Sequence, residues 1–242
     1  MKDDAPIGPY LLALDTATAI GSVAVFAQDR LLGSQQIRRQ ASHARLLMPM
    51  VESLLGHLSL RPTDLTAVGV SAGPGSYTGL RVGVSTAKGL CYGLGLPLLS
   101  LSSLQGLADA QGELAQRLEA RIMPLLDARR MEVYGAPFDA TGQSLGEIEA
   151  RVVEGPETFA THLSAGRVIF CGDGAAKCRP LLDAHPNAIM LTEQLSHAQH
   201  MGRSLWQRFQ AQQFEDLTTF EPFYLKGVRA TKPKDPLRRG EK

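Results

Sequence analysis

The residues with the spacing to do chemistry lie in one glycine-rich segment, SAGPGSYTGLRVGVSTAKGL, where an apolar run leads into a helix-like stretch. Backbone N–H groups at such a junction bind anions. Gly73, Gly75 and Gly79 are spaced one residue too widely for the dinucleotide motif, and Leu80 stands where a Walker A loop has lysine. Ser76 lies outside any G-x-S-x-G pattern, so no nucleophile elbow is predicted. The segment therefore indicates a phosphate-binding cleft that lacks a complete fingerprint.

Two aspartates each follow an apolar strand-like run, Asp15 in the first half of the chain and Asp127 in the second. Carboxylates placed in this way hold magnesium-bound phosphates in a cleft between two lobes. They are equally suited to cap the turns that follow them. Together with Gly73, Gly75 and Ser76, they form the predicted nucleotide cleft, which we expect to be vestigial.

No metal site is predicted. His197 and His200 are three residues apart and could share a helix face, but no third ligand is close in sequence, so we expect exposed histidines. The cysteines, at positions 91, 171 and 178, are odd in number and form no C-x-x-C pair. We expect them to be buried and reduced.

Small side chains recur every fourth residue in the helix-like stretch, at Gly79, Gly83, Ala87 and Cys91. The four glycines inside this helix together cost it roughly 4 kcal/mol relative to alanine. A stripe of small residues lets another backbone approach closely. Packing within the chain, contact with another subunit and approach of a ligand all remain open as reasons for the stripe.

The elements around these residues follow a recognisable order. Three strands with short connections, an amphipathic helix, a strand, the glycine-rich helix and a final strand are the plan of a ribonuclease H-like lobe. The predicted strands are residues 10–17, 22–27, 31–37, 67–73 and 96–103, and the predicted helices begin near Ser42 and Ser76.

The second half of the chain repeats the first. Residues 121–127 are again an apolar strand that ends in aspartate, followed by a turn and a strand over 132–138. The sequence therefore predicts an α/β protein with a two-lobed actin-like plan of tandem ribonuclease H-like lobes. The predicted parts are an N-terminal lobe over 1–107, a C-terminal lobe over 108–222 whose last helix packs back on the first lobe, and a basic tail over 223–242.

Composition and charge limit the functional class. Of the 242 residues, 44% are hydrophobic, the net charge is +1, and no run is long enough for a membrane helix, so we expect a cytoplasmic globular protein without membrane contact. The segment from Lys226 to Lys242 contains seven basic residues and only two acidic ones. Like charges of this density bind phosphates. The predicted nucleic-acid contacts are Lys226, Arg229, Lys232 and Lys234.

Five blocks of the sequence resemble the TsaB/YeaZ family. They are LALDTATAIGSVAV, SHARLLMPMVESLL, SAGPGSYTGLRVG, LLDARRMEVY and FEPFYLKG, and they extend from about Leu11 to Lys226. The resemblance implies an actin-like (ASKHA) fold. It also implies a role in transferring threonylcarbamoyl to the adenosine 3′ of the anticodon, in tRNAs that read codons beginning with A.

The resemblance further implies that the chain is not itself an enzyme. The paralogous transferase TsaD carries two metal-binding histidines four residues apart, and the matching positions here are Ser103 and Leu107. No cofactor is expected to bind tightly to this chain alone, and ATP or ADP would bind only at the interface of a complex. The implied partners are TsaD in a heterodimer, the ATPase TsaE, a second copy in isolation, and tRNA through the complex. The implied interface with TsaD comprises Leu46, Leu47, Met50, Val51, Leu54, Gly79, Gly83 and Ala87.

Three other functions remain as alternatives. An actin-like phosphotransferase would transfer phosphate from ATP and would use Asp15 and Asp127 around magnesium. A peptidase would need a zinc triad, a nucleophile elbow or a cysteine–histidine pair, which the motifs do not supply. A homodimeric scaffold unrelated to tRNA would show no pairing with TsaD.

Overall fold

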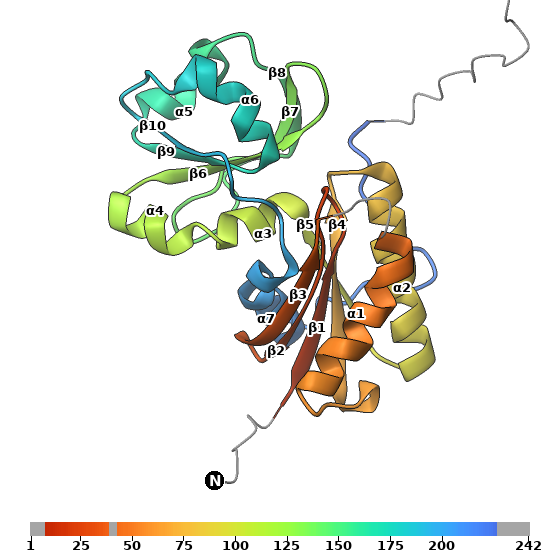
Figure 1. The fold of residues 1–242 in the computed structure, drawn as a ribbon. Helices are drawn as coiled ribbons and strands as arrows, with labels where there is room; N and C mark the ends of the chain where they lie inside the picture. Colours follow the sequence, from red (N-terminus) through yellow and green to blue (C-terminus); the bar gives the residue numbers. More distant parts are fainter. Residues whose placement is uncertain (1–7, 39–42, 227–242) are drawn as a thin grey trace, which may run out of the picture.

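The computed structural model describes residues 8–38 and 43–226 and folds them into two lobes (Figure 1). A five-stranded sheet forms the first lobe, in the order β3-β2-β1-β4-β5. β1 to β3 pair antiparallel as the predicted meander, and β4 and β5 pair parallel to β1 and β4. The strands are β1 (Tyr10–Asp15), β2 (Gly21–Ala27), β3 (Arg30–Ile37), β4 (Leu65–Gly73) and β5 (Leu98–Ser102).

The second lobe repeats this topology strand for strand. Its sheet has the order β10-β9-β6-β7-β8, in which β6 takes the central place of β1, β7 and β8 pair antiparallel, and β9 and β10 pair parallel. The strands are β6 (Arg121–Asp127), β7 (Glu132–Gly135), β8 (Glu149–Val152), β9 (Val168–Cys171) and β10 (Ala188–Leu191). The predicted tandem ribonuclease H-like lobes are confirmed.

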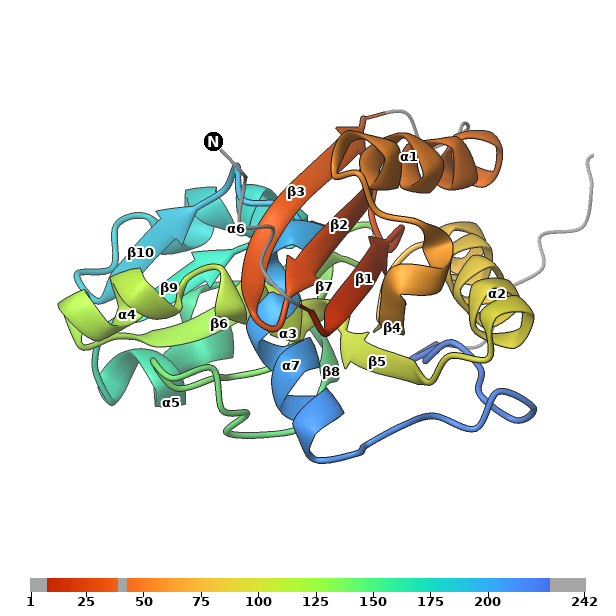
Figure 2. The same cartoon turned by 90° about the horizontal axis from the view of Figure 1, so that it is seen from below.

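Helices cover both faces of both sheets (Figures 1 and 2). α1 and α2 cover the outer face of the first sheet, α5 and α6 cover the outer face of the second, and α3, α4 and α7 lie between the sheets. The helices are α1 (His43–His57), α2 (Tyr77–Leu94), α3 (Ser103–Asp109), α4 (Gly112–Leu118), α5 (Ala160–Ser164), α6 (Asp173–Leu182) and α7 (Gly202–Gln210), and the 3₁₀ turns are η2 (Pro62–Asp64), η3 (Pro156–Phe159) and η4 (Ala198–His200).

Alternation along β1 explains why the first sheet is covered on both faces. Leu12 and Leu14 point into a core cluster with residues of α1 and α2. Leu11 and Ala13 point the other way, into a cluster with residues of η4 and α7. Because successive side chains of a strand face opposite sides, a continuous apolar run such as this one must be buried twice.

The glycine-rich helix α2 has the predicted bounds. Ser76 is its N-cap, and its hydroxyl oxygen accepts a hydrogen bond from the Gly79 N–H at 3.3 Å. At the other end Gly95 adopts a left-handed conformation, with φ of 67°, and ends the helix. Ser42, the predicted cap of α1, lies outside the described residues.

The first part of the predicted C-terminal lobe, residues 108–120, belongs to the core of the second lobe. α3 and α4 lie there, and Ala108 and Ala115 are buried in the cluster that contains Ile122 and Ile169 of the second sheet. The last helix, α7, begins at Gly202, after the separate turn η4. His197 precedes η4 with extended backbone, and its ring accepts a hydrogen bond from the Gln199 N–H, so His197 and His200 do not share a face of α7.

After α7 the chain runs back along the first lobe. Glu215 donates its N–H to the Leu98 carbonyl at 2.9 Å, and the Ser100 hydroxyl bonds to the Glu215 carboxylate at 2.5 Å. Leu217 and Phe220 then pack against the first core cluster. We call residues 215–226 the C-terminal strap. None of the helices within 8–38 and 43–226 is long and apolar enough to cross a membrane.

Candidate functional site

The glycine-rich loop packs directly against the turn that follows β1. The Ser76 N–H donates to the Ala17 carbonyl at 2.7 Å, and the Thr16 hydroxyl donates to the Gly79 carbonyl at 2.7 Å. The two segments predicted to hold phosphates therefore hold each other, and the N–H groups of Ser76 and Gly79 both bond within the protein.

The glycines of this loop are required by that close contact. A Cβ at Gly75 would lie 2.4 Å from the Ala17 carbonyl oxygen, and one at Gly79 would lie 2.1 Å from the Thr16 carbonyl oxygen. Gly73 has a φ of 115°, which favours glycine, and a Cβ there would lie 2.6 Å from the Phe223 carbonyl oxygen. The loop is thus shaped by neighbouring backbone on two sides.

Asp15 lies at the end of β1 and is 1% exposed. Its carboxylate accepts hydrogen bonds from the Ala17 N–H, at 2.9 Å, and from the Ser196 hydroxyl. Burial raises the pKa of Asp15, although these hydrogen bonds and that of Ser71 act in the opposite direction. The carboxylate caps its own turn, which is one of the two roles left open by the sequence.

Asp127 takes the equivalent place at the end of β6. It pairs with Lys177 at 2.5 Å and accepts the Arg129 N–H at 2.7 Å. Partial burial raises the pKa of Asp127, but the Lys177 and Arg129 hydrogen bonds outweigh it and hold the pKa below its usual value. Asp15 and Asp127 are bonded to separate sets of residues, and the described part of the chain holds no group of three or more metal-ligating side chains.

The expectation of exposed histidines is wrong. His197 is 7% exposed and its Nδ1 accepts the Gln199 N–H at 3.0 Å, while its ring lies 5.8 Å from that of His200. Burial, with the nearby His200 and Arg38, lowers the pKa of His197 to about 4. The three cysteines are buried and free, as predicted.

The predicted partner interface divides into buried and accessible residues. Leu47, Val51 and Leu54 of α1 belong to the first core cluster together with Ala87, and are at most 4% exposed. Gly83 is also buried, with Thr16 Oγ1 2.4 Å from the place of a Cβ. These residues, with Gly79, pack within the lobe, so we correct the prediction that they contact a partner.

The accessible members of the predicted interface are both on α1, and α2 has other exposed residues. Leu46 and Met50 of α1 are partly exposed. On α2 the large aromatic Tyr92 is 86% exposed, and the sequence analysis did not single it out. The sequence signal that could have identified Tyr92 is that it does not belong to the small-residue stripe, which faces inward. Beside it, Gly89 and Gly93 face open space.

Only Lys226 of the four predicted nucleic-acid contacts lies within the described residues. It forms an ion pair with Glu132 of the second lobe, and its ammonium lies 5.9 Å from the centre of the Tyr134 ring. Arg229, Lys232 and Lys234 lie outside the described residues. Lys226 thus contacts the second lobe, whereas the strap that leads to it runs along the first lobe.

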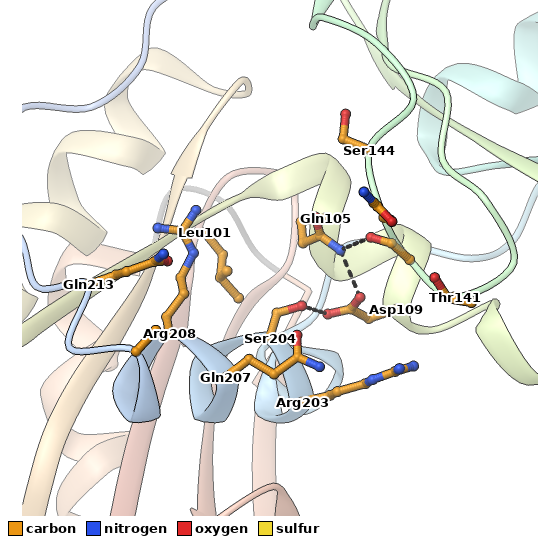
Figure 3. A pocket seen from close by; sticks show the side chains of 13 residues that line it. Leu101, Gln105, Asp109, Thr141, Ser144, Arg203, Ser204, Gln207, Arg208 and Gln213 are labelled. Carbon is orange, nitrogen blue, oxygen red and sulfur yellow. Dashed lines mark hydrogen bonds between the residues drawn. The ribbon is translucent and has the colours of Figure 1, made fainter.

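A polar cavity of about 500 Å³ lies between the lobes, lined by α3, α7 and residues 141–144 (Figure 3). Asp109 accepts the Ser204 hydroxyl at 2.5 Å and the Gln105 amide at 2.9 Å, and the same amide donates to the Gly142 carbonyl at 2.8 Å. Burial raises the pKa of Asp109. These hydrogen bonds join α3, α7 and the loop that contains Gly142. The residues that line the cavity therefore connect the two lobes.

Two lobes of identical strand order, joined through helices between their sheets, make this an actin-like protein with tandem ribonuclease H-like lobes. The chain belongs to the family described as "TsaD: tRNA N6-adenosine threonylcarbamoyltransferase", whose model matches residues 37–235.

Relatives of this chain carry the name "tRNA threonylcarbamoyladenosine biosynthesis protein TsaB". The protein of Bacillus subtilis is 38% identical over 124 residues, which cover 51% of this chain and 52% of that protein. The Escherichia coli protein is 36% identical over 149 residues, covering 61% and 63%. The chain thus spans about half to two thirds of the length of these relatives.

A solved structure agrees over nearly the whole chain. "YeaZ from Pseudomonas aeruginosa" is 26% identical with a TM-score of 0.74, covering 89% of this chain and 99% of that one. A second structure, titled as an uncharacterized protein with similarity to peptidase YEAZ, has a TM-score of 0.75 at 26% identity. The resemblance to TsaB/YeaZ proteins is confirmed.

Proposed function

We propose that this chain is a non-catalytic subunit in tRNA threonylcarbamoyladenosine biosynthesis, where it pairs with a TsaD-type transferase that modifies the adenosine 3′ of the anticodon. The names of the TsaB relatives support the process. The observation that carries the non-catalytic role is the direct contact between the glycine-rich loop and the turn after β1.

That contact uses N–H groups that a bound nucleotide would need. A phosphate at the start of α2 would need the N–H donors that Ser76 and Gly79 give to Ala17 and to the Ser76 hydroxyl. Ser103 and Leu107, at the positions that match the histidines of TsaD, are at most 1% exposed. Ser103 bonds to Ser71 at 2.7 Å. The chain alone would therefore bind ATP or ADP weakly, and nucleotide would bind at the joint of a complex.

The outer faces of α1 and α2 would pair with the transferase. Leu46, Met50 and Tyr92 offer apolar and aromatic side chains there, and Gly89 and Gly93 leave room for a partner helix. Exposed apolar surface of this kind associates with itself when its partner is missing, so the isolated chain would form homodimers. In the complete machine TsaE would join this pair, and tRNA would bind through the complex.

Reconstitution of tRNA modification with and without this chain tests the proposal. The transferase, TsaE and the enzyme that makes threonylcarbamoyl-adenylate are supplied in both arms. Modification should require this chain. ATP turnover by the purified chain alone, or full modification without it, would overturn the non-catalytic role.

The proposed surface is tested by charge substitution on α2. Tyr92→Arg should abolish co-purification with the transferase while circular dichroism and thermal unfolding stay as in the wild type. Leu145→Arg is the matched control, because Leu145 is 50% exposed on the second lobe. Retained pairing in Tyr92→Arg would remove this surface from the proposal.

A further inference from the structure

An aromatic cluster lies on the surface where the C-terminal strap ends. The rings of Tyr77 and Tyr224 lie 4.8 Å apart, and the Arg81 guanidinium lies 5.4 Å from the centre of the Tyr77 ring. Tyr77 is 40% exposed, and Phe223, which precedes Tyr224 in the strap, is 44% exposed. Aromatic side chains with this much exposure retain apolar faces that water solvates poorly.

The backbone holds the cluster in place. The Phe223 N–H donates to the Ala72 carbonyl at 2.8 Å, which attaches the strap to the end of β4. Tyr77 begins α2, directly after the Ser76 cap. Two rigid elements thus present the rings, and little side-chain freedom is lost when a flat ligand binds them. In Figure 1 this end of the strap lies beside the first turn of α2.

Basic side chains lie near Lys226, two residues after Tyr224, where the strap contacts the second lobe. Lys226 pairs with Glu132, and the Lys177 ammonium donates to the Arg130 carbonyl at 2.8 Å, so these groups are close together. Arg129 and Arg130 are exposed in the turn between β6 and β7. Asp127 and Glu132 offset part of the charge. Beyond Lys226 the sequence adds six basic residues and two acidic ones.

We propose that Tyr77, Phe223 and Tyr224 form a stacking platform for unpaired bases of RNA, with Arg81 and the basic residues around Lys226 contacting the phosphates. Single-stranded RNA is bound by this combination of aromatic faces, arginine and a cationic rim, because every base has a face that can stack. This inference rests on the proposed function, which supplies a tRNA as the substrate. It goes further in naming where an unpaired segment of that tRNA binds.

The test uses the full chain and a fluorescein-labelled single-stranded RNA of about 12 nucleotides, a length within the range of single-strand binding sites. Anisotropy titrations across a KCl series give the affinity and its dependence on salt. Phe223→Ala should weaken binding about 5-fold to 100-fold, with no change in the salt dependence, because stacking releases no counterions. Arg130→Gln should instead reduce the slope of log K against log salt by about 0.7.

Phe214→Ala is the matched control, since Phe214 is 41% exposed and lies just before the strap, outside the cluster. It should bind the RNA as the wild type does. A duplex of the same length should bind more weakly than the single strand and should not respond to Phe223→Ala. A 2-aminopurine base in the single strand should be quenched on binding, and Tyr77→Leu should reduce that quenching.

The outcomes separate this inference from the proposed function. RNA binding that is absent in the wild type, or unchanged in Phe223→Ala, overturns the platform, while pairing with the transferase and tRNA modification would still hold. A Phe223→Ala variant that loses pairing but keeps RNA affinity would assign the cluster to a protein partner and also overturn it. If the wild-type chain neither paired with the transferase nor supported tRNA modification, the proposed function would be refuted instead.

Discussion

The Ser196 hydroxyl donates a hydrogen bond to Asp15 Oδ2 across 181 residues of sequence. Asp15 ends the central strand of the first lobe, and Ser196 lies between the last strand of the second lobe and η4. Both are 1% exposed. A buried carboxylate therefore fixes the point at which the chain returns to its first lobe.

We expect Ser196→Ala to lower the free energy of unfolding by about 1 to 3 kcal/mol, because it leaves a buried carboxylate oxygen without its hydroxyl donor. Urea unfolding measures the change. The control is Ser164→Ala, since Ser164 is exposed and bonds only locally, to the Thr161 carbonyl. Equal stabilities for the two variants would contradict the role given to Ser196.

Two glycines of α2 should respond oppositely to alanine. Gly83→Ala places a methyl group against Thr16 Oγ1 and should destabilise the fold by about 1 to 3 kcal/mol. Gly89→Ala meets nothing within 4 Å and should stabilise it by about 0.5 to 1 kcal/mol through helix propensity. Thermal unfolding checks both. A stabilising Gly83→Ala would mean that the stripe does not pack on the turn after β1.

Acid should destabilise the protein partly through His197. The unfolded side chain takes up a proton below its ordinary pKa of 6.5, whereas burial holds the folded pKa at about 4, so stability is lost as the pH falls through this window. Between about pH 7 and about pH 4.5, the free energy of unfolding should fall less in His197→Asn than in the wild type, by roughly 1 to 3 kcal/mol. Urea unfolding at the two pH values measures this.

His57→Asn is the control for that measurement, because His57 is exposed at the end of α1. Its loss of stability over the same pH range should match that of the wild type. The His197 explanation would be wrong if both variants lost the same free energy.

The strap should contribute measurably to the first lobe. Phe220 packs against the first core cluster, and its carbonyl accepts the Lys88 ammonium at 2.9 Å. Phe220→Ala should cost about 1 to 3 kcal/mol, less than a fully buried phenylalanine, because the side chain is only partly buried. Glu221→Ala, at the exposed neighbouring position, should be within about 0.5 kcal/mol of the wild type in the same thermal unfolding assay.

The regular elements of the first lobe could be predicted because their signals are local. The run of apolar residues in β4 and the cap and end of α2 at Ser76 and Gly95 depend on neighbours in the sequence. The second lobe gave weaker signals. We did not predict α6, which contains Gly174 and Pro180, or the four-residue strands β8 and β10.

The candidate site was harder to predict, because its contacts join distant segments. The stripe in α2 was visible in the sequence, but only the carbonyl of Thr16 and the core around Ala87 show that it faces inward. Likewise, no local pattern indicates that Ser196 bonds to Asp15 or that Phe223 attaches to Ala72. Those pairings depend on how the second lobe and the strap return to the first.

The path of the strap sets an order of events during synthesis. The first lobe gains its hydrogen bonds from Glu215 to β5 and from Phe223 to β4 only after the whole second lobe has been translated. A nascent chain that ends before η4 also lacks α7, which covers one face of the first sheet. The lobe that begins first is therefore the one that is finished last.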